Sequence, residues 1–160
     1  MNRCLTALAA VALVACSSLT SAEKAERDAK TAQAVEKALT ERQYTVTIQM
    51  MYPRGGKTVN VSPDFSLQVK GDTLVSYLPY FGRVYSVPYG GGNGLNFTAP
   101  IKEYQFEKDE KGNAHILIRV YTAEDNFTYS LNVFTNGSTS IDVSAREREA
   151  ISYSGQMELY

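Results

Sequence analysis

An alternation of apolar and polar residues runs through most of the chain after residue 43 and restricts it to β structure. Tyr44, Val46, Ile48 and Met50 alternate with polar residues, which places them on one face of an extended strand. The same period of two returns in five later runs: Phe65, Leu67 and Val69; Ile116, Ile118 and Val120; Phe127, Tyr129, Leu131 and Val133; Thr139, Ile141 and Val143; Tyr153, Met157 and Leu159. We therefore expect half-buried strands over nearly all of this region.

Short turn sequences separate these runs. Gly71-Asp72, residues 109–113, residues 124–126 and Asn136-Gly137 each stand between neighbouring alternating runs. Connections this short join antiparallel neighbours and leave no room for parallel crossovers. The turns therefore predict a meander.

Residues 21–43 have a different pattern. They contain no Gly or Pro, and apolar residues recur at spacings of three and four, from Ala25 to Val35 and Leu39. The spacing predicts an amphipathic helix whose second half packs and whose first half is solvated. The predicted fold class is α+β: an N-terminal helix packed on a curved, mainly antiparallel sheet of about eight strands in meander order. Residues 27–160 form one domain, and the pattern leaves open whether the sheet closes into a barrel.

The N-terminus reads as an export signal. Arg3 precedes an apolar run from Leu5 to Ala15 that is too short to span a bilayer. Its end, Leu13-Val14-Ala15-Cys16, resembles the bacterial lipobox. We therefore expect residues 1–15 to be a lipoprotein signal peptide and Cys16 to be lipidated. Residues 16–26 would then tether the domain to the membrane. The alternative is ordinary secretion with cleavage after Ala22. No acidic residue follows the cysteine closely, so the expected location is the outer membrane, facing the periplasm.

The composition disfavours several kinds of partner and chemistry. Removing Arg3 with the leader leaves 15 basic residues (16 − 1) against 17 acidic ones, and these basic residues are scattered, which argues against nucleic acid as a partner. His115 is the only histidine and is expected at the surface, while Cys4 and Cys16 are the only cysteines and precede the predicted domain. We therefore expect no nucleophilic triad, no metal site and no cofactor.

Carboxylates are the remaining route to catalysis. Glu103 with Glu107, Glu124 with Asp125, and Glu147 with Glu149 are expected on solvent faces or in turns, where carboxylates have no catalytic role. Residues 146–149, Arg-Glu-Arg-Glu, are expected to form a solvated turn between the last two strands. We therefore expect a protein that is not an enzyme, with a carboxylate-based hydrolase as the less favoured reading.

Residues 77–97 break the alternation and form the candidate binding surface. Pro79 and Pro88 place the segment at a sheet edge, a bulge or a loop, and its glycine run lacks the lysine of a phosphate-binding loop. Aromatic rings with polar tips suit a sugar, a peptide or a protein surface, with the arginine as an anion contact. The plainer alternative is that the tyrosines cover one end of the core and Arg83 pairs with an acid. The candidate residues are Tyr77, Tyr80, Phe81, Arg83, Tyr85 and Tyr89.

These features favour an envelope-anchored, non-enzymatic binding module whose ligand is a small molecule or an envelope protein. Docking to a protein partner, or an inhibitory structural role, is the alternative. A concave apolar cavity would favour a small ligand, and a flat exposed aromatic patch would favour a protein.

The stretch from Tyr77 to Tyr85, together with the lipobox, the helix and the β-rich remainder, resembles a family of secreted Bacteroidetes lipoproteins catalogued as a domain of unknown function (four-two-five-one). The resemblance implies export and a single compact domain, and it brings no activity or site residues. If the source is such a bacterium, Asp72-Thr73-Leu74 also looks like its short O-glycosylation signal, which would place a glycan on Thr73.

Overall fold

The computed structural model describes residues 21–85 and 94–159, and within them one helix is followed by nine strands of a single antiparallel sheet. Both the α+β class and the meander order predicted from the sequence are confirmed. The elements are α1 (Ser21–Thr40), β1 (Gln43–Pro53), β2 (Val59–Asn60), β3 (Ser66–Lys70), β4 (Thr73–Leu78), β5 (Leu95–Lys108), β6 (Ala114–Tyr121), β7 (Asn126–Val133), β8 (Ser138–Ala145) and β9 (Ile151–Met157).

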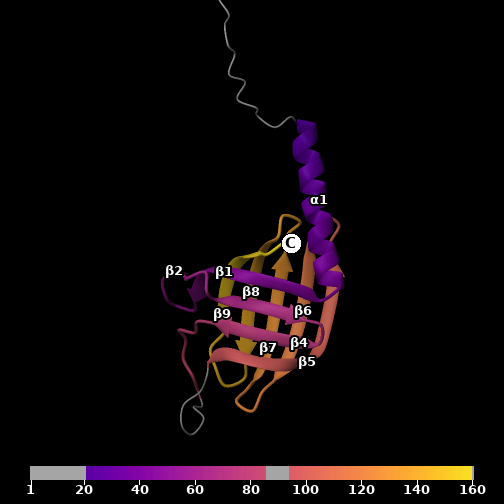
Figure 1. Cartoon of the computed structure of the whole chain (residues 1–160). Coiled ribbons are helices and arrows are strands. Elements are labelled where there is room, and N and C mark those ends of the chain that lie inside the picture. The colour runs from indigo at the N-terminus through magenta and orange to yellow at the C-terminus, as the bar shows by residue number, and fades with distance from the viewer. Residues whose placement is uncertain (1–20, 86–93, 160) are drawn as a thin grey trace, which may run out of the picture.

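The sheet closes on itself because the first strand pairs with the last. β1 bonds to β3 through residues 43–47 and to β9 through residues 46–53, and β5 likewise bonds to β4 with its first half and to β6 with its second. Only β2, which pairs with β1 at its far end, stands outside the ring. In Figure 1 the strands on one side of the barrel run across those on the other.

The apolar faces of the strands fill the barrel, as the alternation predicted for most positions. Two predicted positions are wrong. The register of β1 against β9 shifts between Ile48 and Met50, so Met51 is fully buried and Met50 only partly. Leu159 lies beyond the end of β9 and is exposed.

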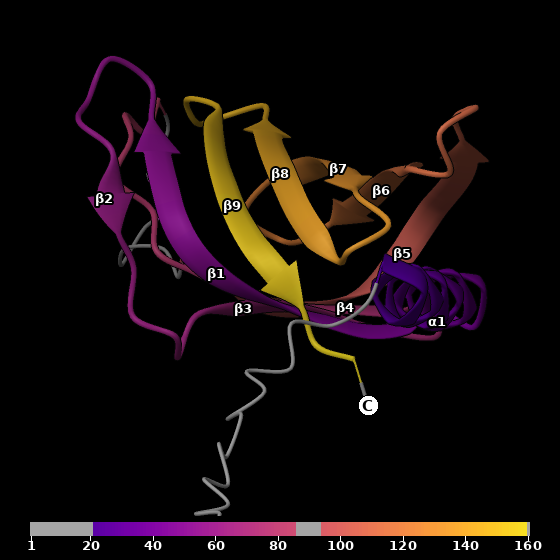
Figure 2. The same cartoon turned by 90° about the horizontal axis from the view of Figure 1, so that it is seen from above.

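The helix covers one end of the barrel with its second half. Residues 21–30 are exposed on every side, whereas Val35 and Leu39 are buried against the sheet. Glu36 forms an ion pair of 2.8 Å with Lys108 of β5, and Figure 2 shows the helix lying beside that strand. The helix ends at Thr40 rather than at the predicted residue 43, because Arg42 adopts a φ of 52° and reverses the chain into β1. Within the two described ranges, no helix is long and apolar enough to cross a membrane.

Buried tyrosines make the barrel sensitive to alkali. Burial raises the pKa of Tyr44, Tyr129 and Tyr153 above its ordinary value near 10. Above that pH the unfolded chain loses these protons more readily than the folded one, so stability present at neutral pH is lost as the pH rises. Each tyrosine can remove up to about 1.4 kcal/mol per pH unit.

We therefore expect urea unfolding to show a falling free energy of unfolding between pH 9.5 and 11. Because lysines also titrate in this range, the double variant Tyr129→Phe and Tyr153→Phe is the control, and it should show a shallower fall. Equal slopes for the parent and the variant would contradict this account of the core.

Candidate functional site

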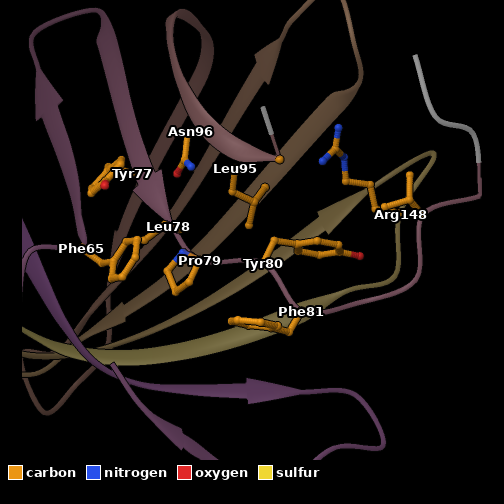
Figure 3. A pocket seen from close by; sticks show the side chains of 11 residues that line it. Phe65, Tyr77, Leu78, Pro79, Tyr80, Phe81, Leu95, Asn96 and Arg148 are labelled. Atoms are coloured by element: carbon orange, nitrogen blue, oxygen red, sulfur yellow. The ribbon is translucent and has the colours of Figure 1, made fainter. Parts of the chain in front are cut away.

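A pocket of about 550 Å³ lies at the end of the barrel away from the helix. The helix end is tied to the β3–β4 turn, where the Gly71 amide donates to the carbonyl oxygen of Arg42 over 2.8 Å. The pocket is at the opposite end of β4, where Tyr77 and Leu78 line it, and Figure 3 shows these side chains. Its lining comprises Phe65, Tyr77, Leu78, Pro79, Tyr80, Phe81, Val84, Gly94, Leu95, Asn96 and Arg148.

Two paired strand ends build one side of the pocket. Tyr77 of β4 stands directly opposite Asn96 of β5, and the next pair, Leu78 and Leu95, is buried and points into the barrel. The ring of Phe65, which precedes β3, stacks on the ring of Tyr77 with centroids 5.0 Å apart and planes 22° from parallel. The site therefore has an apolar floor and an aromatic wall.

A chain of buried hydroxyls supports the floor. The Tyr129 hydroxyl donates to Ser76 Oγ over 3.0 Å, and Ser76 Oγ donates to the carbonyl oxygen of Leu95 over 2.6 Å. The Tyr153 hydroxyl donates to the carbonyl oxygen of Pro79 over 2.6 Å. These bonds satisfy polar groups that would otherwise be costly to bury. The bond to Pro79 also fixes the backbone just before Tyr80.

The second side of the pocket is the segment from Tyr80 to Tyr85. The Tyr80 hydroxyl lies 2.9 Å from the carbonyl oxygens of both Arg83 and Glu149. A Cβ at Gly82 would lie 2.5 Å from that hydroxyl oxygen, so a larger residue there would displace the end of the Tyr80 side chain. An isolated bridge between Val84 and Arg148 then fastens the segment to the β8–β9 connection.

Arg148, like Phe65, lines the pocket but lies outside the segment that the sequence predicted. Residues 146–149 do not form the expected solvated turn, because the Arg148 side chain is only 5% exposed. Its Nη2 donates to Glu124 Oε2 over 3.0 Å, and its Nε lies 3.4 Å from Asp125 Oδ2 without hydrogen-bonding geometry. The guanidinium carbon also lies 5.9 Å from the centre of the Tyr80 ring. Burial of this cation depends on acids from a turn more than twenty residues earlier.

The prediction that Asp125 is a solvated turn carboxylate is also wrong. Its side chain is 0% exposed. Oδ1 accepts hydrogen bonds from the amides of Asn126 and Arg146 over 2.8 and 3.0 Å, and Oδ2 accepts one from the amide of Glu147 over 3.2 Å. The carboxylate therefore joins the β6–β7 turn to the β8–β9 connection, and its lone pairs are used structurally.

The structure brings together only part of the predicted surface. Tyr77, Tyr80 and Phe81 line the pocket, while Arg83 and Tyr85 are exposed beside it and are not among its lining residues. Arg83 contacts Glu149 through its backbone amide, at 3.3 Å from Glu149 Oε2, and no ion pair of its side chain is found within the described part of the chain. Tyr89 lies outside the described residues.

Two modification sites, Cys16 and Thr73, are predicted from the sequence. Cys16 lies outside the described residues. Thr73 is the first residue of β4 and is half-buried, and the neighbouring Asp72 pairs with Arg42 over 3.0 Å. Glycosylation of Thr73 therefore stays a prediction.

Metal-ligating side chains are not clustered in the described residues. No group of three or more His, Cys, Asp or Glu side chains in residues 21–85 and 94–159 is arranged to hold a metal ion. His115 is exposed on β6, with Nδ1 2.5 Å from Asn132 Oδ1. The polar groups at the pocket are suited to binding through hydrogen bonds.

The fold and the pocket define a class: a small antiparallel barrel, plugged at one end by a helix, with an aromatic pocket at the other. The chain belongs to the family described as "Domain of unknown function (DUF4251)", whose model matches residues 26–157. It is similar to the crystal structure of a DUF4251 family protein from Bacteroides eggerthii, with a TM-score of 0.67 and 16% identity over 84% of this chain and 91% of that chain. A search of curated proteins found no match.

Proposed function

We propose that this protein is a non-enzymatic binding module of the cell envelope that holds a small ligand in the aromatic pocket. The observation that carries the proposal is the pocket itself, about 550 Å³ in volume, where four aromatic side chains meet a buried arginine. Ligand sites typically have volumes of about 300–1,000 Å³ and combine apolar walls with a few convergent polar groups.

The rigidity of the site supports this proposal. Tyr80, Pro79 and Ser76 are each held by hydrogen bonds to backbone or to buried side chains, so the pocket is formed before a ligand arrives. A preformed pocket loses less conformational entropy on binding than a flexible surface does.

Export and lipidation remain part of the proposal, and the arrangement of the molecule suits them. The first ten residues of α1 project from the barrel end opposite the pocket and correspond to about 15 Å of helix (Figure 1). A lipid on Cys16 would therefore hold the barrel away from the membrane, with the pocket on its far side.

Docking of a protein partner is the second candidate, and it rests on a specific observation. Phe81, which lines the pocket, and Tyr85, four residues later in the same segment, are each 67% exposed. Exposed aromatic rings beside a groove are common at protein interfaces. Small-ligand binding and protein docking would both use this end of the barrel. They differ in whether the bound partner is a small molecule or a protein.

The test is thermal unfolding of the full chain with three panels of compounds: neutral oligosaccharides, apolar tripeptides and fatty acids. We expect at least one compound to raise the melting temperature, because a ligand at a hundred times its Kd stabilises the folded state by about 2.7 kcal/mol. Phe81→Ala should remove that shift without lowering the stability of the free protein, since its ring is largely exposed.

Phe134→Ala is the matched control. This phenylalanine is 46% exposed, follows the end of β7, and does not line the pocket. The parent's shift should survive in this variant. A shift that Phe81→Ala leaves intact, or the absence of a shift with every panel, would contradict the small-ligand proposal.

A further inference from the structure

We propose that the ligand of the aromatic pocket is a neutral saccharide, bound with a ring face against the aromatic wall and with its hydroxyls toward Tyr77, Asn96 and Arg148. This inference rests on the proposed function and names its ligand class. Three features of the lining support it: the shape of the aromatic surface, the free polar groups beside it, and the charge balance.

The aromatic wall is flat rather than deep. Phe65 and Tyr77 are stacked nearly parallel, and Tyr77 remains 46% exposed. Phe81 adds a ring that is 67% exposed at the other side of the opening (Figure 3). Flat, accessible rings match the C–H face of a pyranose, which is apolar and broad, whereas a fatty-acid chain would need an enclosed channel to be covered.

Polar groups without partners stand beside this wall. The hydroxyl of Tyr77 and the side-chain amide of Asn96 make no hydrogen bond within the described part of the chain, although the two residues face each other across β4 and β5. Together they can donate and accept at adjacent points. A ligand rich in hydroxyls can satisfy both at once while its ring covers the aromatic wall, whereas a peptide could satisfy them only through its backbone.

Arg148 gives the pocket a third polar contact. Its side chain is more than nine-tenths buried and lines the pocket, and Nε lacks a hydrogen-bond partner among the described residues. Nε is closed to solvent and lies 3.4 Å from Asp125 Oδ2, so a ligand oxygen would meet the other atoms of the Arg148 side chain. A ring hydroxyl is an acceptor of suitable size.

The charge balance favours a neutral ligand over an anion. Arg148 is the only charged residue lining the pocket among the described ones, and Glu124 and Asp125 already neutralise it at 3.0 and 3.4 Å. A carboxylate or phosphate in the pocket would therefore meet no unpaired cation among the lining residues, since Arg83 stands outside the lining, and would be repelled by two nearby acids. This disfavours uronic acids and fatty acids as ligands.

Calorimetric titration of the full chain tests the inference with five probes: maltotriose, cellotriose, tri-N-acetylchitotriose, trigalacturonate and laurate. We expect at least one neutral trisaccharide to bind more tightly than both anions. Tyr77→Phe, which keeps the ring, and Asn96→Ala should each weaken that binding about fivefold, the loss of one hydrogen bond.

Asn132→Ala is the control, because Asn132 lies on β7 with its side chain bound to His115 and Ser140, and it should bind like the parent. Tighter binding of laurate or trigalacturonate, or neutral binding that neither Tyr77→Phe nor Asn96→Ala weakens, would overturn the saccharide inference. If the thermal panels also show a tripeptide shift that Phe81→Ala removes, the proposed binding function would stand with a different ligand class. If no compound in either experiment binds, both proposals fail.

Discussion

Replacing Arg148 by methionine is expected to lower the free energy of unfolding by about 3 kcal/mol or more. The arginine is the counter-charge of Asp125, whose side chain is 0% exposed and cannot gain hydration without moving. Methionine preserves much of the apolar contact with the rings of Tyr80 and Phe127 but leaves the carboxylate without a cation. Urea unfolding at neutral pH measures the loss.

Arg146→Met is the matched control from the same connection. The Arg146 side chain is 79% exposed and pairs with Glu147 at 3.4 Å, so its replacement should cost about 0.5 kcal/mol or less. Adding Asp125→Asn to Arg148→Met removes the uncompensated charge, and the double variant should be less unstable than the sum of the two single losses. Losses that simply add, or a similar loss for Arg146→Met, would show that the buried ion pair does not stabilise this end of the barrel.

Alanine at position 155 is expected to destabilise the protein by about 3 kcal/mol, because it pushes apart the strands that close the barrel. A Cβ on Gly155 of β9 would lie 2.2 Å from the carbonyl oxygen of Thr47 and 3.2 Å from the Cα of Ile48. Both atoms belong to the backbone of β1, so no side chain can turn away to make room. The clash falls next to the register shift in β1.

Gly56→Ala provides the comparison for this variant. Gly56 lies in the exposed turn after β1, and its nearest new contact would be the Pro53 side chain at 3.2 Å, which has room to shift. Its loss should stay below about 1 kcal/mol. Thermal unfolding of both variants measures the difference, and equal melting temperatures would contradict the close approach of β1 and β9.

Local patterns predicted the strands because each strand carries its own evidence. Val46 and Ile48 alternate with polar neighbours in the chain itself, and turns such as Asn136-Gly137 specify antiparallel pairs without reference to distant residues. The position of Met51 could not be obtained in this way. Its inward direction depends on the bulge beside Gly155, which exists only when β1 meets a strand about a hundred residues later.

The candidate site was predicted only where its residues are close in sequence. Tyr77, Tyr80 and Phe81 stood out by their local density, but Phe65 reaches the pocket because Ser66 pairs with Tyr77. Arg148 was not predicted because the residues that bury it are also distant in sequence. Four alternating charges favour a solvated turn, and only the contact with Glu124 and Asp125 allows one of them to be buried.

The proposal that the aromatic pocket binds the ligand can be examined residue by residue with an amide chemical-shift map of the isotopically labelled protein. The probe is the panel compound that raises the melting temperature most. We expect the largest shifts on Tyr77, Phe81, Leu95, Asn96 and Arg148 at this end of the barrel. Shifts gathered instead on the outer face of β6 to β9, with these residues unmoved, would contradict it.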